Sequence, residues 1–123
     1  MGLDSIISRS PGTTKLSAED ERALTESGIQ LCGSFTSNGI TSFRGKVYSL
    51  FVREVTGVSL YEEWIPPETI SEMADALAKV DPETIGEQLD LGEYSTPSPG
   101  EVRSLQELFR LCAERGLGII AWA

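Results

Sequence analysis

The chain has 123 residues, of which 40% are hydrophobic and 24% are charged, and its formal net charge at pH 7 is −9. This length is typical of one domain, and we expect a single domain over residues 1–123. The composition is too apolar for a disordered chain, and no apolar run reaches the roughly 18 residues of a membrane span. No secretory signal is visible, so the sequence predicts a cytoplasmic protein. Histidine is absent, which removes the usual general base and the commonest transition-metal ligand.

The negative charge is concentrated in one third of the chain. Residues 60–101 carry eleven acidic side chains and one basic side chain, whereas residues 1–59 are neutral and residues 102–123 have a net charge of +1. Such a segment repels nucleic acids and anionic membranes, so neither is an expected partner. It attracts a basic protein surface. The alternative interpretation is a solvated face that only keeps the protein soluble.

The first quarter of the chain predicts two strands around a helix. Residues 3–8 alternate as in a short strand, and a loop follows. Ser17 is typical of a helix N-cap, with Asp20 at the position where a capping box places an acid. Gly28 ends this helix, and the alternation of residues 29–33 predicts a second strand.

The next segment predicts a hairpin and a helix. Asn38 and Gly39 both tolerate positive φ, as a type I′ turn requires, which favours a hairpin over residues 31–45. Residues 46–56 favour a helix that ends at Gly57, although a strand is also compatible with their composition. The apolar face of that helix would contain Val47, Leu50, Phe51 and Val55.

Two further helices have clear signals at their ends. Residues 66–80 begin with two prolines, and their apolar residues recur at helical spacing. A short helix over residues 82–89 and a loop over residues 90–98 follow. Ser98 and Glu101 form a second capping box, for a helix that Gly116 ends. Its buried face would contain Val102, Leu105, Leu108, Phe109 and Cys112.

The chain ends in an apolar strand from Leu117, and its pattern predicts burial on both faces. We therefore expect an α+β fold: a mixed or antiparallel sheet of three to five strands with about four helices packed on it.

The sequence contains no recognisable catalytic or cofactor-binding motif. It lacks phosphate-binding glycine loops, a nucleophile elbow and EF-hand spacing, so no cofactor and no metal is expected. Neighbouring carboxylates, such as Glu62 and Glu63, are predicted to be exposed and alike, which does not suit acid–base chemistry. Cys32 and Cys112 are interpreted as small buried hydrophobic residues. These absences favour a protein that is not an enzyme.

Our leading hypothesis is a non-enzymatic interaction domain, of the inhibitor or adaptor type, that presents an acidic surface to a basic protein. Aromatic side chains beside carboxylates suit an interface anchor with an acidic rim. The alternative for Trp64 is that it fills the core between two helices. The predicted partner-binding residues are Tyr61, Glu62, Glu63, Trp64, Glu68, Glu72 and Asp75.

The alternative hypothesis is a small-ligand or anion-binding domain, with or without a minor enzymatic activity. Arg44 and Lys46 stand where the predicted helix over 46–56 begins, although the helix dipole disfavours cations there. Phe43 and Tyr48 are interleaved with them. An anion held by these two cations and by free amides would explain the arrangement. An internal ion pair, or a helix that begins later, would explain it equally.

Overall fold

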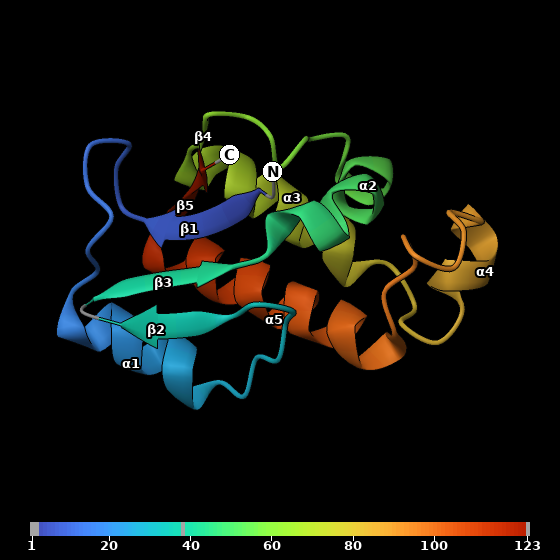
Figure 1. Ribbon diagram of the computed structural model, residues 1–123, viewed down its shortest axis with the longest axis horizontal. Coiled ribbons are helices and arrows are strands. Elements are labelled where there is room, and N and C mark those ends of the chain that lie inside the picture. Colours follow the sequence, from blue (N-terminus) through green and yellow to red (C-terminus); the bar gives the residue numbers. More distant parts are fainter. Residues whose placement is uncertain (1–2, 38, 123) are drawn as a thin grey trace.

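In the computed structural model, five strands form one sheet in the order β2-β3-β1-β5-β4, with the longer helices behind or beside it and one short helix at an end of the molecule, away from the sheet (Figure 1). The structure describes residues 3–37 and 39–122. The strands are β1 (Asp4–Ser8), β2 (Phe35–Ser37), β3 (Ile40–Phe43), β4 (Trp64–Ile65) and β5 (Gly118–Trp122). The helices are α1 (Ala18–Glu26), α2 (Gly45–Thr56), α3 (Pro67–Ala78), α4 (Ile85–Leu89) and α5 (Pro99–Arg115). All strand pairs are antiparallel, which confirms the α+β prediction.

β1 is the central strand, and its side chains show how the two faces of the sheet differ. Because side chains alternate along a strand, Ile6 and Ile7 point to opposite faces. Ile7 is fully buried in the hydrophobic core that the helices close on one face. Ile6 is 8% exposed and lies outside that core cluster. The register pairs Ile6 with Ser42 of β3 and with Ile120 of β5.

α5 is the longest helix and follows its sequence signals closely. The capping box is present: the Ser98 hydroxyl accepts a hydrogen bond from the Glu101 amide at 3.2 Å, and the Glu101 carboxylate accepts one from the Ser98 amide at 3.0 Å. Gly116, with φ of 69°, ends the helix. All five residues predicted for its buried face are buried. α5 packs along α3, whose start after Pro66 is also as predicted.

The predicted hairpin is confirmed, although its strands are shorter than residues 31–45. Ser37 pairs with Ile40, so the connection has two residues. Gly39 has φ of 79°, as a turn of this kind requires. The conformation predicted for Asn38 lies outside the described residues.

The strand predicted over residues 29–33 is wrong. In this segment the Gln30 amide donates to the hydroxyl of Ser104 on α5, and the Cys32 amide donates to the hydroxyl of Tyr48 on α2. These amides therefore bond to helix side chains instead of a neighbouring strand. Cys32 is exposed as a result, contrary to the prediction that it is buried.

α2 is a helix and ends at Gly57, but its buried face is rotated relative to the predicted one. Phe51 is buried as predicted, and Leu50 and Val55 are half-buried. Tyr48 and Val52 are buried as well, whereas Val47 is 37% exposed. The first turn of the helix fixes this rotation, because the Lys46 amide donates to the carbonyl of Leu3 next to β1.

The short helix predicted over residues 82–89 begins later than expected, at Ile85. The carboxylate of Asp81 accepts a hydrogen bond from the Glu83 amide at 2.9 Å. This bond stabilises a turn before the helix, as aspartate side chains commonly do.

Candidate functional site

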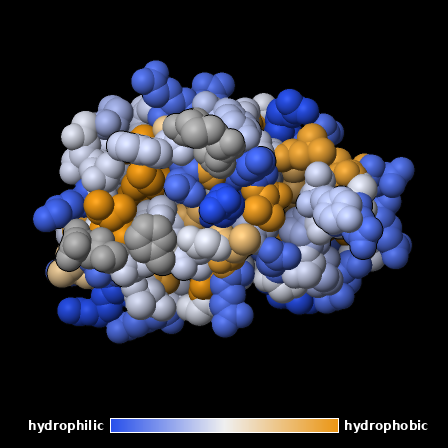
Figure 2. Space-filling view, in the orientation of Figure 1, coloured by the Kyte–Doolittle hydropathy of each residue, from blue (hydrophilic) through white to orange (hydrophobic). Residues whose placement is uncertain are grey.

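One face of the sheet has no described helix over it. In Figure 1, α1, α3 and α5 lie behind the strands, and α2 lies beside the end of β1. Figure 2 shows this face from the same side, with separate groups of hydrophobic residues exposed between hydrophilic ones. Large exposed apolar side chains on one face of a small domain can mark an interaction site.

A row of paired residues crosses this face. It runs from Ser42 of β3 through Ile6 and Ile120 to Trp64 of β4. Trp122 follows two residues after Ile120, so it points to the same face, and its side chain is 64% exposed. Ile120 and Trp64 are half-buried. We call Ile6, Trp64, Ile120 and Trp122 the outer patch.

The outer patch corrects two expectations. Trp64 does not fill the core between two helices, because it lies on the open face of the sheet and outside the core cluster. The strand β5 is not buried on both faces either: Ile119 is fully buried, whereas Ile120 and Trp122 reach the surface. The apolar pattern of β5 therefore reflects a core face and an exposed apolar face.

Two of the predicted acidic residues border the outer patch. Glu62 and Glu63 are exposed and directly precede Trp64. The carbonyl of Glu63 accepts a hydrogen bond from the Ala121 amide at 3.3 Å, which fixes this segment beside β5. Tyr61 is 53% exposed. The structure thus brings the segment Tyr61–Trp64 to one edge of the open face.

The other three predicted acidic residues belong to the helix layer. Glu68, Glu72 and Asp75 are exposed on α3. None of the five predicted carboxylates forms an ion pair within the described residues. α4 and its acids lie at the far end of the molecule's long axis from β4 (Figure 1). The acids of residues 60–101 are therefore spread along the molecule and do not form one lobe.

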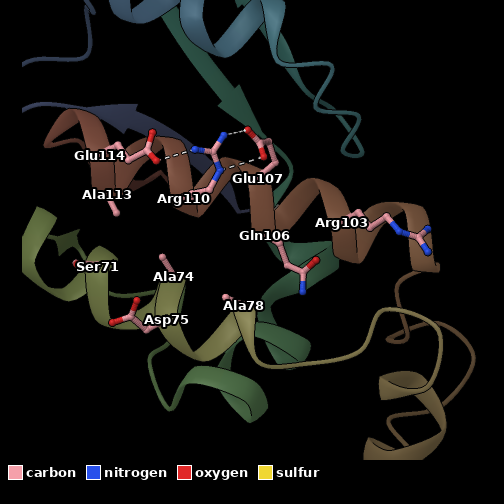
Figure 3. Close-up of a pocket in the computed structure, with 10 residues that line it drawn as sticks. All are labelled: Ser71, Ala74, Asp75, Ala78, Arg103, Gln106, Glu107, Arg110, Ala113 and Glu114. Atoms are coloured by element: carbon pink, nitrogen blue, oxygen red, sulfur yellow. Dashed lines mark hydrogen bonds and ion pairs between the residues drawn. The ribbon is translucent and has the colours of Figure 1, made fainter.

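A groove of about 580 Å³ runs between α3 and α5 (Figure 3). Asp75 lies on its α3 side, and Arg110 lies on its α5 side in ion pairs with Glu107 and, at 2.7 Å, with Glu114. The side-chain amide of Gln106 donates to the carbonyls of Leu77 and Val80. Arg103 and four small side chains complete the lining: Ser71, Ala74, Ala78 and Ala113. Both arginines that line the α5 side already have carboxylate partners, and the groove follows the packing seam of the two helices.

The basic pair Arg44 and Lys46 is exposed at the start of α2. Arg44 lies 3.7 Å from a carboxylate oxygen of Asp4. The amides of Lys46 and Val47 already donate to backbone carbonyls, so they are not free for an anion. Phe43 and Tyr48 are buried, and their rings contact each other with centroids 6.2 Å apart. An anion site here stays a prediction that rests on the two cations alone.

A buried polar contact that the sequence did not reveal joins α2 to α5. The Tyr48 hydroxyl donates to the carboxylate of Glu101 and accepts from the Cys32 amide. Burial, together with the nearby carboxylate, raises the pKa of Tyr48. Burial acts against ionisation of Glu101 too, but the hydrogen bonds from Tyr48 and Ser98 lower its pKa below the usual value. This arrangement keeps the phenol neutral and positions the segment 29–33.

Comparison of the chain with protein-family models, with curated proteins and with solved structures finds no match. No helix in the described part of the chain is both long enough and apolar enough to cross a membrane. Within residues 3–37 and 39–122, no three side chains of cysteine, aspartate or glutamate converge where they could hold a metal ion. Because Trp122 is exposed on the open face beside exposed carboxylates, we take the outer patch and its acidic border as the candidate functional site.

Proposed function

We propose that the protein is a non-enzymatic interaction domain that binds a partner protein through the open face of its sheet. The observation that carries this proposal is the exposure of Trp122 on the same face of the sheet as Trp64, a face that no described helix covers. Tryptophan is enriched among the residues that dominate binding energy at protein interfaces. Exposure of an indole to water also has an unfavourable free energy in the free protein. Burial of the ring against a partner would remove that unfavourable contribution.

The partner that suits this face has an apolar centre and basic side chains at one margin. Glu62 and Glu63 border the outer patch, and their carboxylates have no ion-pair partner among the described residues. Lysine or arginine side chains of the partner would be attracted there, which raises the association rate at low salt. Glu68, Glu72 and Asp75 lie on α3 in the helix layer, so in this proposal they contribute only longer-range attraction for a basic partner.

The test distinguishes binding through the outer patch from attraction by the overall negative charge of the chain. Three variants are compared with the wild type: Trp122→Ser, the pair Glu62→Lys and Glu63→Lys, and the control pair Glu87→Lys and Glu93→Lys. The control changes the net charge by the same amount but lies away from β4, in and after α4. Partners are captured from cell extract, identified, purified and titrated against each variant.

We expect a partner whose Kd rises by about tenfold or more with either of the first two changes, and by less than about threefold with the control. Its affinity should also fall as salt is raised. If the captured proteins bind all three variants as tightly as the wild type, the outer patch is not the binding surface. If only the control pair loses binding, the acidic α4 region is the site and this proposal is wrong.

A further inference from the structure

A pocket of about 170 Å³ lies on the opposite side of the sheet from the outer patch, beneath the hairpin of β2 and β3. In Figure 1 this hairpin lies over α1. Its deep wall consists of buried apolar side chains: Ile7, Leu24, Leu31, Phe43 and Leu108. We call this the hairpin pocket. Protein interiors are close-packed, so a hollow of this size beside five buried apolar residues is a distinct feature of the fold.

The size of the side chains on the hairpin explains why the space is open. Thr36 of β2 pairs with Thr41 of β3, and Thr41 also pairs with Ile7 of β1. Both threonines line the pocket, opposite Leu24 of α1. Two small polar side chains therefore stand where larger apolar ones would fill the gap between hairpin and helix.

The mouth of the pocket is mostly polar and uncharged. Thr25, Ser34 and Thr36 line it and are exposed, while Thr41 and the apolar Ile29 are half-buried. The hydroxyls of Thr36 and Thr41 lie 3.1 Å apart and share one hydrogen bond. Two hydroxyls carry two protons, so one proton remains to donate outward. Among the described residues, no charged side chain lines the pocket.

We infer that the hairpin pocket binds a small neutral molecule that has one apolar ring, or a branched chain of similar size, and one hydrogen-bonding group. The apolar part would contact Leu24, Phe43 and Leu108. The polar group would reach the hydroxyls of Thr36 and Thr41. An apolar cavity of about 150 Å³ is known to hold benzene, which sets the size of the ring. An anionic ligand is disfavoured because no cation would compensate its desolvation.

The test uses benzyl alcohol as the probe, with toluene and benzoate as matched ligands, and records methyl NMR spectra of the wild-type protein. The neighbouring residues Ile6 and Ile7 report on opposite faces of the sheet. We expect benzyl alcohol to shift the methyl signals of Ile7, Leu24 and Leu108 in a saturable way, and to leave those of Ile6 and Ile120 unchanged. Benzoate should bind at least about tenfold more weakly.

Two variants test the pocket directly. Thr36→Val with Thr41→Val keeps the shape but removes the hydroxyls, so the preference for benzyl alcohol over toluene should disappear. Leu24→Phe fills the hollow and should abolish the methyl shifts caused by benzyl alcohol and by toluene. Ser71→Phe, in the α3–α5 groove, should leave both sets of shifts unchanged. Absence of a saturable shift in the wild type would overturn the inference, as would equal binding of benzoate. These ligand comparisons do not depend on whether Leu24→Phe folds, nor on the partner proposed for the outer patch.

Discussion

Nε of Arg115 lies 2.7 Å from Oδ1 of Asp20, and this contact ties the end of α5 to the first turn of α1. Arg9 binds the other carboxylate oxygen, with Nη2 at 2.7 Å from Oδ2. The side chain of Asp20 is fully buried, while the two arginines remain partly exposed. A buried carboxylate with two cationic partners fixes three segments of the chain: the loop after β1, α1 and α5.

The pH dependence of stability should report on this carboxylate. Burial acts to raise the pKa of Asp20, but hydrogen bonds from Arg115, Ser17 and Arg9 outweigh it, so the pKa lies below its ordinary value of 3.8. A carboxyl with a lowered pKa in the folded chain stabilises the fold at pH above 3.8, and this stabilisation is lost as pH falls through the folded value.

We predict that Asp20→Asn lowers the free energy of unfolding by about 2–3 kcal/mol at neutral pH, because both arginines lose their partner. The difference from the wild type should shrink as pH falls from 3.8 to the lowered pKa of the folded carboxyl, below which the wild-type side chain is neutral as well. Urea unfolding at a series of pH values measures both effects. Glu26→Gln, an exposed change on the same helix, should stay within about 0.5 kcal/mol. A difference that persists unchanged into acid would contradict the role given to the charge.

The close approach of α2 to β1 gives a second prediction. Gly45 is the first residue of α2, and a Cβ atom there would meet the hydroxyl of Ser5 and lie 3.2 Å from a methyl of Leu3. We expect Gly45→Ala to cost about 1–3 kcal/mol of stability by overpacking. The Ser5 hydroxyl is buried and has no hydrogen-bond partner in the described part of the chain. Ser5→Ala should therefore stabilise the protein by up to about 1 kcal/mol.

A double-mutant cycle separates these two effects. In the Ser5→Ala background, Gly45→Ala should cost less than it does alone, since the nearest contact has been removed. Thermal and urea unfolding of the four proteins give the coupling free energy. Strict additivity would show that the two residues do not touch in solution.

Local signals explain how much of this fold could be predicted from sequence. Ser98, Glu101 and Gly116 set the ends of α5 through bonds within a few residues, and these ends were predicted correctly. The two-residue hairpin connection is local in the same way. The segment 29–33 failed because its amides bond to Tyr48 and Ser104, which no short-range pattern reveals.

The candidate site also combines features set by local sequence with features set by contacts between distant residues. The pattern around Trp64 predicted an interface anchor, but strand order decides which face it occupies, and that order comes from pairings across the whole chain. The apolar pattern after Leu117 predicted burial on both faces, and only the fold shows that the face of β5 with Trp122 is exposed. Asp20 was predicted as part of a capping box, and its burial follows from arginines eleven and ninety-five residues away.

The two cysteines should differ sharply in reactivity. Cys32 is exposed, whereas Cys112 is fully buried in the core, where burial raises the pKa of its thiol to about 12. Only a thiolate attacks a disulfide reagent readily. We predict that a chromogenic thiol reagent labels one cysteine in the native protein and both in urea, and that Cys32→Ser removes the native signal. Rapid labelling of Cys112 in native Cys32→Ser protein would show that the core opens locally.

The position of Trp64 on the outer patch depends on Gly118. A Cβ atom at this residue would lie 2.6 Å from Cη2 of Trp64, closer than any real contact between carbon atoms. We predict that Gly118→Ala displaces the indole, shifts the tryptophan emission to longer wavelength as Trp64 becomes more exposed, and lowers stability by about 1–3 kcal/mol.

Two companion variants make this result specific to Trp64. Trp122→Phe leaves Trp64 as the only indole, so the emission shift caused by Gly118→Ala can be assigned to it. Adding Trp64→Ala to Gly118→Ala should recover part of the stability lost, because the clash with the ring is gone, although the nearby carbonyl of Ile65 still limits the space. An unchanged emission spectrum in the Gly118→Ala, Trp122→Phe protein would mean that the ring does not lie on Gly118.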